Sequence, residues 1–148
     1  MRAVLQRVLE ANVTVNGQVI SEINRGFLVF LGVTGTDTKI NAETLVDKIT
    51  KLRVFPDEHG KSNLSISDIS GEILVVSQFT LYADTRKGNR PSFTDAAPPD
   101  LANALYEHFV ECCRGKFKKV GTGSFGASMK VSLVNDGPYT IVMEVPSV

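Results

Sequence analysis

An unbroken apolar run, GFLVFLGV over residues 26–33, limits the folds open to this chain more than any other feature of the sequence. A strand with one face in water alternates apolar and polar residues, whereas this run has no polar side chain on either face. The run therefore predicts a strand that is buried on both sides. Ile73-Leu74-Val75-Val76 is a second run of this kind and predicts another central strand.

Shorter segments alternate apolar and polar residues, as half-buried strands do. We expect such strands at 3–9 and 11–15, and further strands at 72–82, 129–135 and 139–145. Asn16-Gly17 separates Val15 from Val19 and predicts a two-residue hairpin, because both turn positions tolerate positive φ.

Two segments have helical periodicity instead. In residues 41–52 the apolar positions fall on one helical face, namely Ala42, Leu45, Val46, Ile49 and Leu52. A second helix is expected to begin near Pro98-Pro99-Asp100 and to end at Gly115. Its predicted apolar stripe is Leu101, Ala104, Leu105, Phe109 and Cys112.

Helices this few cannot cover both faces of a large sheet. The pattern therefore predicts a mixed α and β fold in layers, with two packed sheets and the two helices laid over one of them. The strand order does not follow from the pattern. At 148 residues we expect a single domain over residues 1–148.

Composition narrows the class of protein. No apolar stretch is long enough to span a membrane, and residues 1–10 have no signal-peptide core, which favours a cytoplasmic protein. Cys112 and Cys113 are adjacent in a predicted helix, so a disulfide between them would be strained and reduced thiols are expected. Two histidines and two neighbouring cysteines make a poor ligand set, so no metal site is expected.

Three segments carry more polar groups than a scaffold needs. Ser77, Gln78 and Thr80 follow the buried 73–76 run, and they either bond neighbouring loops or orient an ester and its attacking group. Residues 84–93 hold three cations that suit phosphate, although a solvated surface is the alternative. Residues 135–139 favour a turn between two strands, because they contain Asp-Gly and Gly-Pro.

A small-residue stretch over 121–127 contains one aromatic ring, Phe125. This ring belongs to the core or offers a surface on which a nucleobase can stack. His108 lies on the apolar stripe of the second helix and is interpreted as a buried or rim histidine without an acidic partner nearby.

Taken together, these segments resemble the D-aminoacyl-tRNA deacylase family over essentially the whole chain. The sharpest matches are Ser77-Gln78-Phe79-Thr80-Leu81-Tyr82 and Asn135-Asp136-Gly137-Pro138. The 84–93 loop and Phe125-Gly126-Ala127-x-Met129 also match the family pattern.

The resemblance implies a three-layer β/β/α fold and a homodimer with active sites at its interface. It implies hydrolysis of D-aminoacyl-tRNA, and of glycyl-tRNA mischarged on a tRNA such as tRNA-Ala, as proofreading in translation quality control. It also implies that a cis Gly137-Pro138 bond reaches into the partner's pocket and rejects L-aminoacyl esters with main-chain carbonyls.

For the chemistry, the resemblance leaves two accounts. Thr80 is the nucleophile in one, although no base lies near it in the sequence. In the other, which we favour, the ribose 2′-hydroxyl of the tRNA assists, and the amides of Phe79 and Thr80 stabilise the oxyanion. Ser77 and Gln78 would position the substrate, Phe125 and Met129 would hold the 3′-terminal adenosine, and no cofactor is implied.

Two other classes stay open at this point. A non-catalytic dimer that binds RNA ends would use the cationic loop and Phe125 equally well. A conventional Ser or Cys hydrolase would need a base, for which the chain offers only His59 and His108.

Overall fold

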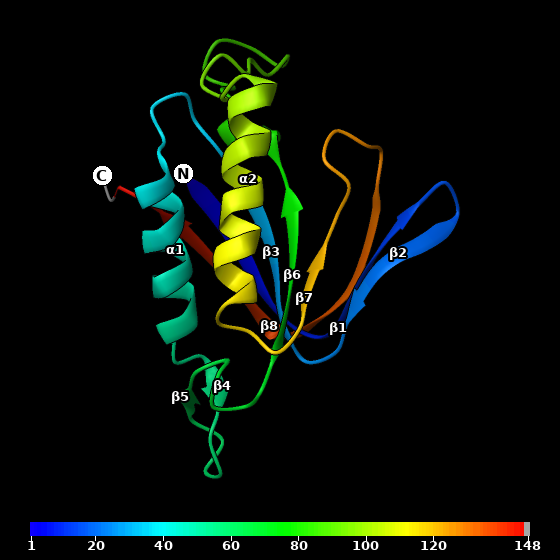
Figure 1. Cartoon of the computed structure of the whole chain (residues 1–148), viewed down its shortest axis with the longest axis vertical. Coiled ribbons are helices and arrows are strands. Elements are labelled where there is room, and N and C mark those ends of the chain that lie inside the picture. The colour runs from blue at the N-terminus through cyan, green and yellow to red at the C-terminus, as the bar shows by residue number, and fades with distance from the viewer. Residues whose placement is uncertain (147–148) are drawn as a thin grey trace.

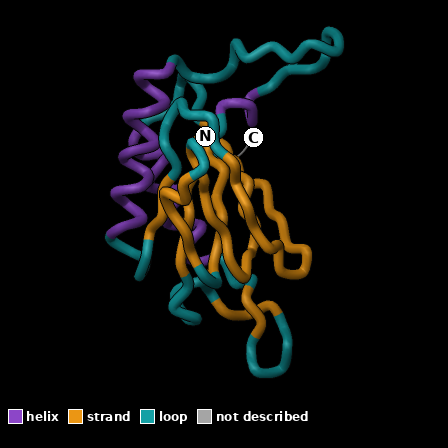
Figure 2. Tube along the Cα trace, turned by 90° about the vertical axis from the view of Figure 1, so that its right-hand side faces the viewer, coloured by secondary structure: helices purple, strands orange, loops and turns teal. Residues whose placement is uncertain are grey.

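The computed structural model describes residues 1–146 and shows a curved sheet with two long helices on one side (Figures 1 and 2). The helical elements are α1 (Lys39–Lys51), the 3-10 turn η1 (Phe79–Tyr82) and α2 (Pro99–Arg114). The strands are β1 (Arg2–Val15), β2 (Gln18–Ile23), β3 (Gly26–Gly32), β4 (Phe55–Pro56), β5 (Ser62–Leu64), β6 (Glu72–Ser77), β7 (Val120–Thr122) and β8 (Lys130–Glu144). Within residues 1–146, no helix is long and apolar enough to cross a membrane.

The long strand β1 organises the antiparallel part of the sheet. Its residues 2–8 pair with β3 and its residues 11–15 pair with β2, while β8 pairs along its other edge. The two segments predicted at 3–9 and 11–15 are therefore one strand. Asn16 and Gly17 have φ values of 50° and 76° between β1 and β2, which confirms the predicted hairpin.

The other half of the sheet is parallel. β3 pairs in parallel with β6, and β6 pairs in parallel with β7. α1 connects β3 to β6 and α2 connects β6 to β7, as parallel neighbours require a crossover. Figure 1 shows both helices on the same face of these strands. The carboxyl ends of β3, β6 and β7 therefore lie together at one end of the molecule.

Two apolar cores flank the central strands. One fills the space between the sheet and the helices and includes Phe27, Val29 and Leu31 of β3. The other lies on the opposite face, where β1, β2 and β8 curve over the central strands; its buried members are Val8, Ala11, Val13, Ile23, Leu28, Leu74 and Val76. This arrangement explains the unbroken apolar run at 26–33 and confirms the predicted mixed α and β fold in layers with the helices on one side. The two packed layers of strands belong to one curved six-stranded sheet.

The helix predictions are mostly confirmed. α1 buries Ala42, Leu45, Val46 and Ile49, and its N-terminus is capped by reciprocal Thr38 and Asn41 contacts. α2 begins at Pro99 and is followed by Gly115, as predicted. Its buried face was predicted in part: Leu105 and Phe109 are buried and Leu101 and Cys112 are partly buried, whereas Ala104 is exposed. The buried residues are Ala102, Leu105, Tyr106, Phe109, Val110 and Cys113. Local periodicity did not predict that Tyr106 is buried. Its hydroxyl donates a hydrogen bond to Val75 O at 2.8 Å.

Two strand boundaries also differ from the prediction. β6 ends at Ser77, and the chain then turns through η1 rather than continuing extended to residue 82. The predicted turn at 135–139 lies inside the single strand β8, where the pairing with β1 shifts register between Gln6 and Val8 and again between Val8 and Glu10. Pairing with β1 on both sides of the irregularity keeps the strand continuous.

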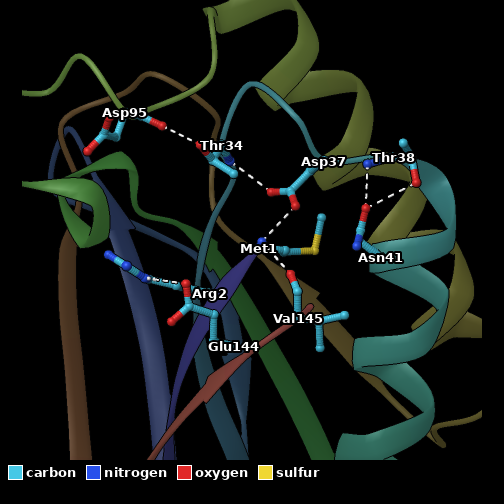
Figure 3. A network of polar contacts seen from close by, with 9 residues as sticks. All are labelled: Met1, Arg2, Thr34, Asp37, Thr38, Asn41, Asp95, Glu144 and Val145. Carbon is cyan, nitrogen blue, oxygen red and sulfur yellow. Dashed lines mark hydrogen bonds and ion pairs between the residues drawn. The ribbon is translucent and has the colours of Figure 1, made fainter. Parts of the chain in front are cut away.

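A buried ionic network fixes the start of β1 (Figure 3). The α-ammonium of Met1 donates to Asp37 Oδ1 and to Val145 O, each at 2.7 Å. Asp37 Oδ2 accepts from the Thr34 amide at 2.8 Å, and Thr34 Oγ1 donates to Asp95 O. The network thus joins β1, the segment after β3 and the segment before α2.

Asp37→Asn should destabilise the fold, because it leaves the buried ammonium of Met1 without its anionic partner. Breaking one side of a buried ion pair costs about 3–5 kcal/mol, and urea unfolding would measure the loss. Asp47→Asn, which removes the exposed partner of Lys51, is the matched control and should leave the midpoint nearly unchanged. Equal unfolding free energies for Asp37→Asn and the parent would contradict this role.

Candidate active site

A cavity of about 710 Å³ opens at the carboxyl ends of the parallel strands. Its walls come from Val33 after β3, from the end of β6 with η1, from the segment after β7, and from the start of α2. The lining residues are Val33, Val76, Ser77, Gln78, Phe79, Phe93, Ala96, Ala97, Pro98, Pro99, Ala102, Phe125, Gly126, Ala127, Met129 and Val131. Ligand sites in open α/β sheets favour this edge.

The structure brings most of the predicted site residues together. Ser77, Gln78 and Phe79 line the cavity on one side, and Phe125 and Met129 line it from the segment after β7. Thr80 is exposed next to Gln78, whose Nε2 donates to Thr80 Oγ1 at 2.5 Å. Two predicted segments that are distant in the sequence therefore meet around one cavity.

Gly137 and Pro138 lie elsewhere in the same chain. Val131 of β8 lines the cavity, and Gly137 is six residues further along that strand, which corresponds to about 20 Å. Both residues are exposed, and the Gly137-Pro138 peptide bond is cis. One copy of the chain does not place this motif in its own cavity.

Arg7 of β1 contacts the residues on either side of Gly137-Pro138. Its Nε donates to Asp136 O at 3.0 Å, and its guanidinium lies 4.6 Å from the centre of the Tyr139 ring. A further bond from Arg7 to Val54 O at 2.6 Å anchors the guanidinium. The Tyr139 amide donates to Asn135 Oδ1 at 2.7 Å, so side chains brace the segment on both sides of Gly137 and Pro138.

No titratable base contacts Thr80 among the residues that the structure describes. His59 follows β4, and Figure 1 shows β4 at the opposite end of the molecule from the carboxyl end of β6. His108 sits on α2 and pairs with Glu43 Oε1 at 2.9 Å, so the prediction that it lacks an acidic partner was wrong. The pair joins α2 to α1, which gives His108 a structural explanation.

The main chain of η1 provides donors at the cavity edge. The Gln78 amide donates to Leu31 O at 2.8 Å, which ties the end of β6 to β3. The amides of Phe79 and Thr80 begin the turn and have no acceptor within it, as at any helical start. These two donors suit a carbonyl oxygen that gains negative charge.

Aromatic rings form the apolar walls. Phe79 and Phe93 meet edge to face with centroids 5.0 Å apart, and Phe125 packs against Tyr106 at 6.2 Å. Phe79 and Phe93 keep 55% and 37% of their surface exposed, so the rings remain available to a planar ligand. Phe93 was not predicted as a wall, because its contact with Phe79 is tertiary and no local pattern shows it.

Close packing against β3 and β1 sets the position of η1. A Cβ atom at Gly32 would lie 3.0 Å from Leu81 Cβ and 3.2 Å from Gln78 O, so no other residue fits there without a shift. Arg2 donates to Leu81 O at 3.1 Å and covers the Tyr82 ring at 4.5 Å. Burial raises the pKa of the Tyr82 hydroxyl far above its ordinary value, so Tyr82 stays neutral.

Comparison with known proteins decides the family. A family profile described as D-Tyr-tRNA(Tyr) deacylase matches residues 4–144. The chain belongs to this family. It is 60% identical over 144 residues to a D-aminoacyl-tRNA deacylase of Thermotoga petrophila, covering 97% of each chain. It is 56% identical to the Clostridioides difficile protein of the same name, again over 97% of each.

Two solved structures share the fold. The chain matches a structure described as the c-Myc DNA Unwinding Element Binding Protein with a TM-score of 0.94 and 47% identity, covering 99% of this chain and 100% of the other. A probable eukaryotic D-amino acid tRNA deacylase shares the fold at 19% identity, with a TM-score of 0.83 and coverage of 96% and 97%. The predicted family and the predicted deacylase class of enzyme are confirmed.

Gly32→Ala should impair this deacylase more than it impairs folding, because the new methyl group pushes η1 away from β3. Misplacing a catalytic segment by a fraction of an ångström is expected to lower kcat/KM about tenfold or more. Gly35→Ala is the matched control, since nothing lies within 4 Å of its Cβ position. Equal ester hydrolysis by the two variants would show that the packing at Gly32 does not set the site.

Proposed function

We propose that the chain hydrolyses the ester bond of D-aminoacyl-tRNA in the cavity at the carboxyl ends of β6 and β7. The products are the free D-amino acid and the tRNA. The observation that carries this proposal is the meeting of the Ser77–Phe79 segment with Phe125 and Met129 around one cavity. Apolar rings on one side and main-chain donors on the other suit an adenosine that carries an activated ester.

Each group at the cavity has a separate role in this proposal. Phe125 and Met129 hold the terminal adenine, while Ser77 and Gln78 position the aminoacyl group. Water adds to the ester carbonyl, and the amides of Phe79 and Thr80 stabilise the negative charge on its oxygen. When the intermediate collapses, the bond to the ribose 3′-oxygen breaks. The neighbouring 2′-hydroxyl passes its proton to that leaving oxygen and takes up the proton that the attacking water gives up, so the ribose ends with both hydroxyls protonated.

Thr80 is part of the pocket rather than the nucleophile in this proposal. Its hydroxyl oxygen accepts a hydrogen bond from the side-chain amide of Gln78. An amide N–H is a donor, so it cannot act as the base that would remove the hydroxyl proton of Thr80. The chemistry therefore relies on the main chain of η1 and on the substrate's own hydroxyl.

Chiral selection is assigned to a second copy of the chain. In a homodimer, the exposed Gly137-Pro138 segment of one copy would reach the cavity of the other, where its main-chain carbonyls would occupy the space that an L side chain needs. Support comes from the exposure of the segment and from its bracing by Arg7. A glycyl ester has no side chain to reject, so glycyl-tRNA mischarged on a tRNA such as tRNA-Ala is also a substrate.

In this proposal the protein works as a proofreading enzyme of the cytoplasm. A gate built from main-chain atoms makes no contact with a D side chain. The enzyme should therefore accept many different D-amino acids rather than one.

Hydrolysis of D-tyrosyl-tRNA and L-tyrosyl-tRNA by the purified protein, with EDTA present, tests the activity and its chirality together. Fast loss of the D ester and slow loss of the L ester are expected. Arg7→Ala should narrow this difference by raising hydrolysis of the L ester, because the carbonyl of Asp136 and the ring of Tyr139 lose their partner.

Arg114→Ala is the control for the Arg7 variant, since Arg114 pairs with the exposed Glu111 near the C-terminal end of α2 and, within residues 1–146, contacts neither the 135–139 segment nor Arg7. An Arg7→Ala protein that is folded and dimeric, yet discriminates as well as the parent, would rule out the braced gate. No turnover of either ester by the parent would instead favour a module that binds RNA ends without catalysis.

Removing either hydroxyl, the 2′-hydroxyl of the tRNA or that of Thr80, tests which of the two takes part in the reaction. A D-aminoacyl-tRNA that lacks the terminal 2′-hydroxyl should react about 100-fold more slowly or worse, the usual size of a lost proton transfer. Thr80→Ala should cost only about fivefold, the worth of one neutral hydrogen bond. Single-turnover rates measure both effects, and the reverse order would make Thr80 the nucleophile.

A further inference from the structure

The loop over residues 84–93 forms a closed arm at the rim of the cavity. Asp84 and Ser92 pair through two main-chain hydrogen bonds, from Asp84 N to Ser92 O at 2.8 Å and from Ser92 N to Asp84 O at 2.9 Å. Phe93 follows directly and lines the cavity against Phe79. Figure 2 shows the loop after the short helical turn extending away from the body of the molecule.

The three cations of this arm have different roles. Arg86 donates to both oxygens of Asp84, from Nε at 2.9 Å and from its terminal nitrogen at 2.7 Å. These bonds lower the pKa of Asp84 to about 2, so the carboxylate stays charged at neutral pH. The negative charge of Asp95 also attracts the Arg86 guanidinium and helps to raise its pKa. Arg86 is therefore neutralised within the protein and closes the base of the arm.

Lys87 and Arg90 stand at the tip and are exposed. Among residues 1–146, neither takes part in an ion pair or a side-chain hydrogen bond, unlike Arg86 two residues from the base. Gly88 between them has a φ of 135°, a conformation that L side chains rarely adopt. Because the chain as a whole has no net charge, this local excess of positive charge is a property of the tip.

The arm that carries these two charges begins at the rim of the cavity, beside Phe79 and Phe93. If the terminal adenosine occupies the cavity, the nucleotides that precede it can leave along this rim. Each of those nucleotides carries a phosphodiester anion. Ammonium and guanidinium groups bind phosphate through charge-assisted hydrogen bonds, and they do so without regard to base sequence.

We propose that Lys87 and Arg90 bind the backbone phosphates next to the 3′ end of the tRNA, so that the arm holds the polynucleotide while its base walls the cavity. This assignment rests on the proposed function. It explains how a chain without a general basic surface binds a polyanion by one end. It also separates the binding of the tRNA strand from the chemistry at η1.

A double variant, Lys87→Ala with Arg90→Ala, tests the assignment on two substrates. One is D-tyrosyl-tRNA, and the other is the D-tyrosyl ester of adenosine, which has no phosphate. Turnover of the tRNA should fall about tenfold or more in kcat/KM, chiefly through KM, and the slope of log affinity against log salt should become shallower by about one to two. Turnover of the adenosine ester should not change.

Lys118→Ala with Lys119→Ala is the matched control. These lysines follow the C-terminal end of α2, and the 16 residues of that helix separate them from the cavity by about 24 Å. The control protein should process both substrates as the parent does. Equal losses in the two double variants would overturn the assignment, because they would show an effect of total charge alone.

Two other results would also overturn it. A loss of the same size on both substrates would mean that the tip shapes the cavity instead of holding phosphate. Unchanged binding of uncharged tRNA by the Lys87 and Arg90 variant would remove the proposed contact directly. The binding measurement needs no turnover, so it tests the arm even if the parent hydrolyses neither ester and the proposed function fails.

Discussion

Parallel pairing of β3, β6 and β7 is the constraint on which the rest of the structure depends. Because the three strands run in one direction, their carboxyl ends meet at one edge, and the chain leaves each of them there. Val33 follows β3, Ser77 ends β6 and Phe125 follows β7, and all three line one cavity. The two crossover helices follow from the same pairing, since each parallel connection must return across the sheet. Burial on both faces then accounts for the apolar runs.

The cavity combines apolar walls with main-chain donors and has few titratable groups. The imidazoles lie elsewhere, His108 in a pair with Glu43 and His59 on the hairpin side of the molecule. An activated ester needs less help than an amide, and in the proposed mechanism the catalytic groups are positioned main-chain amides and a hydroxyl supplied by the substrate. Precision in such a site depends on packing, which is why a glycine at position 32 is required where η1 approaches β3.

Much of the fold could be predicted from local patterns, and the errors have physical causes. Asn16-Gly17 and the apolar face of α1 are local signals, and both predictions are confirmed. The end of β6 at Ser77 was missed because the alternation continues through residue 82, while the turn depends on contacts with Gly32 and Arg2. The 135–139 segment was predicted as a turn because its pairing partner, β1, is more than 100 residues away in the chain. Most of the candidate site followed from the motifs, whereas Phe93 and Arg7 act through tertiary contacts that no local pattern contains.

The most direct test of the central claim is a crystal structure of the protein with a stable amide analogue of D-tyrosyl adenosine. The account predicts adenine against Phe125 and Met129, with the analogue's carbonyl oxygen about 3 Å from the amides of Phe79 and Thr80. A second cavity lies between α2 and the end of β7, where Glu107, Arg114 and Gly123 are among its lining residues. An analogue bound in that groove, with the η1 amides left free, would contradict the account.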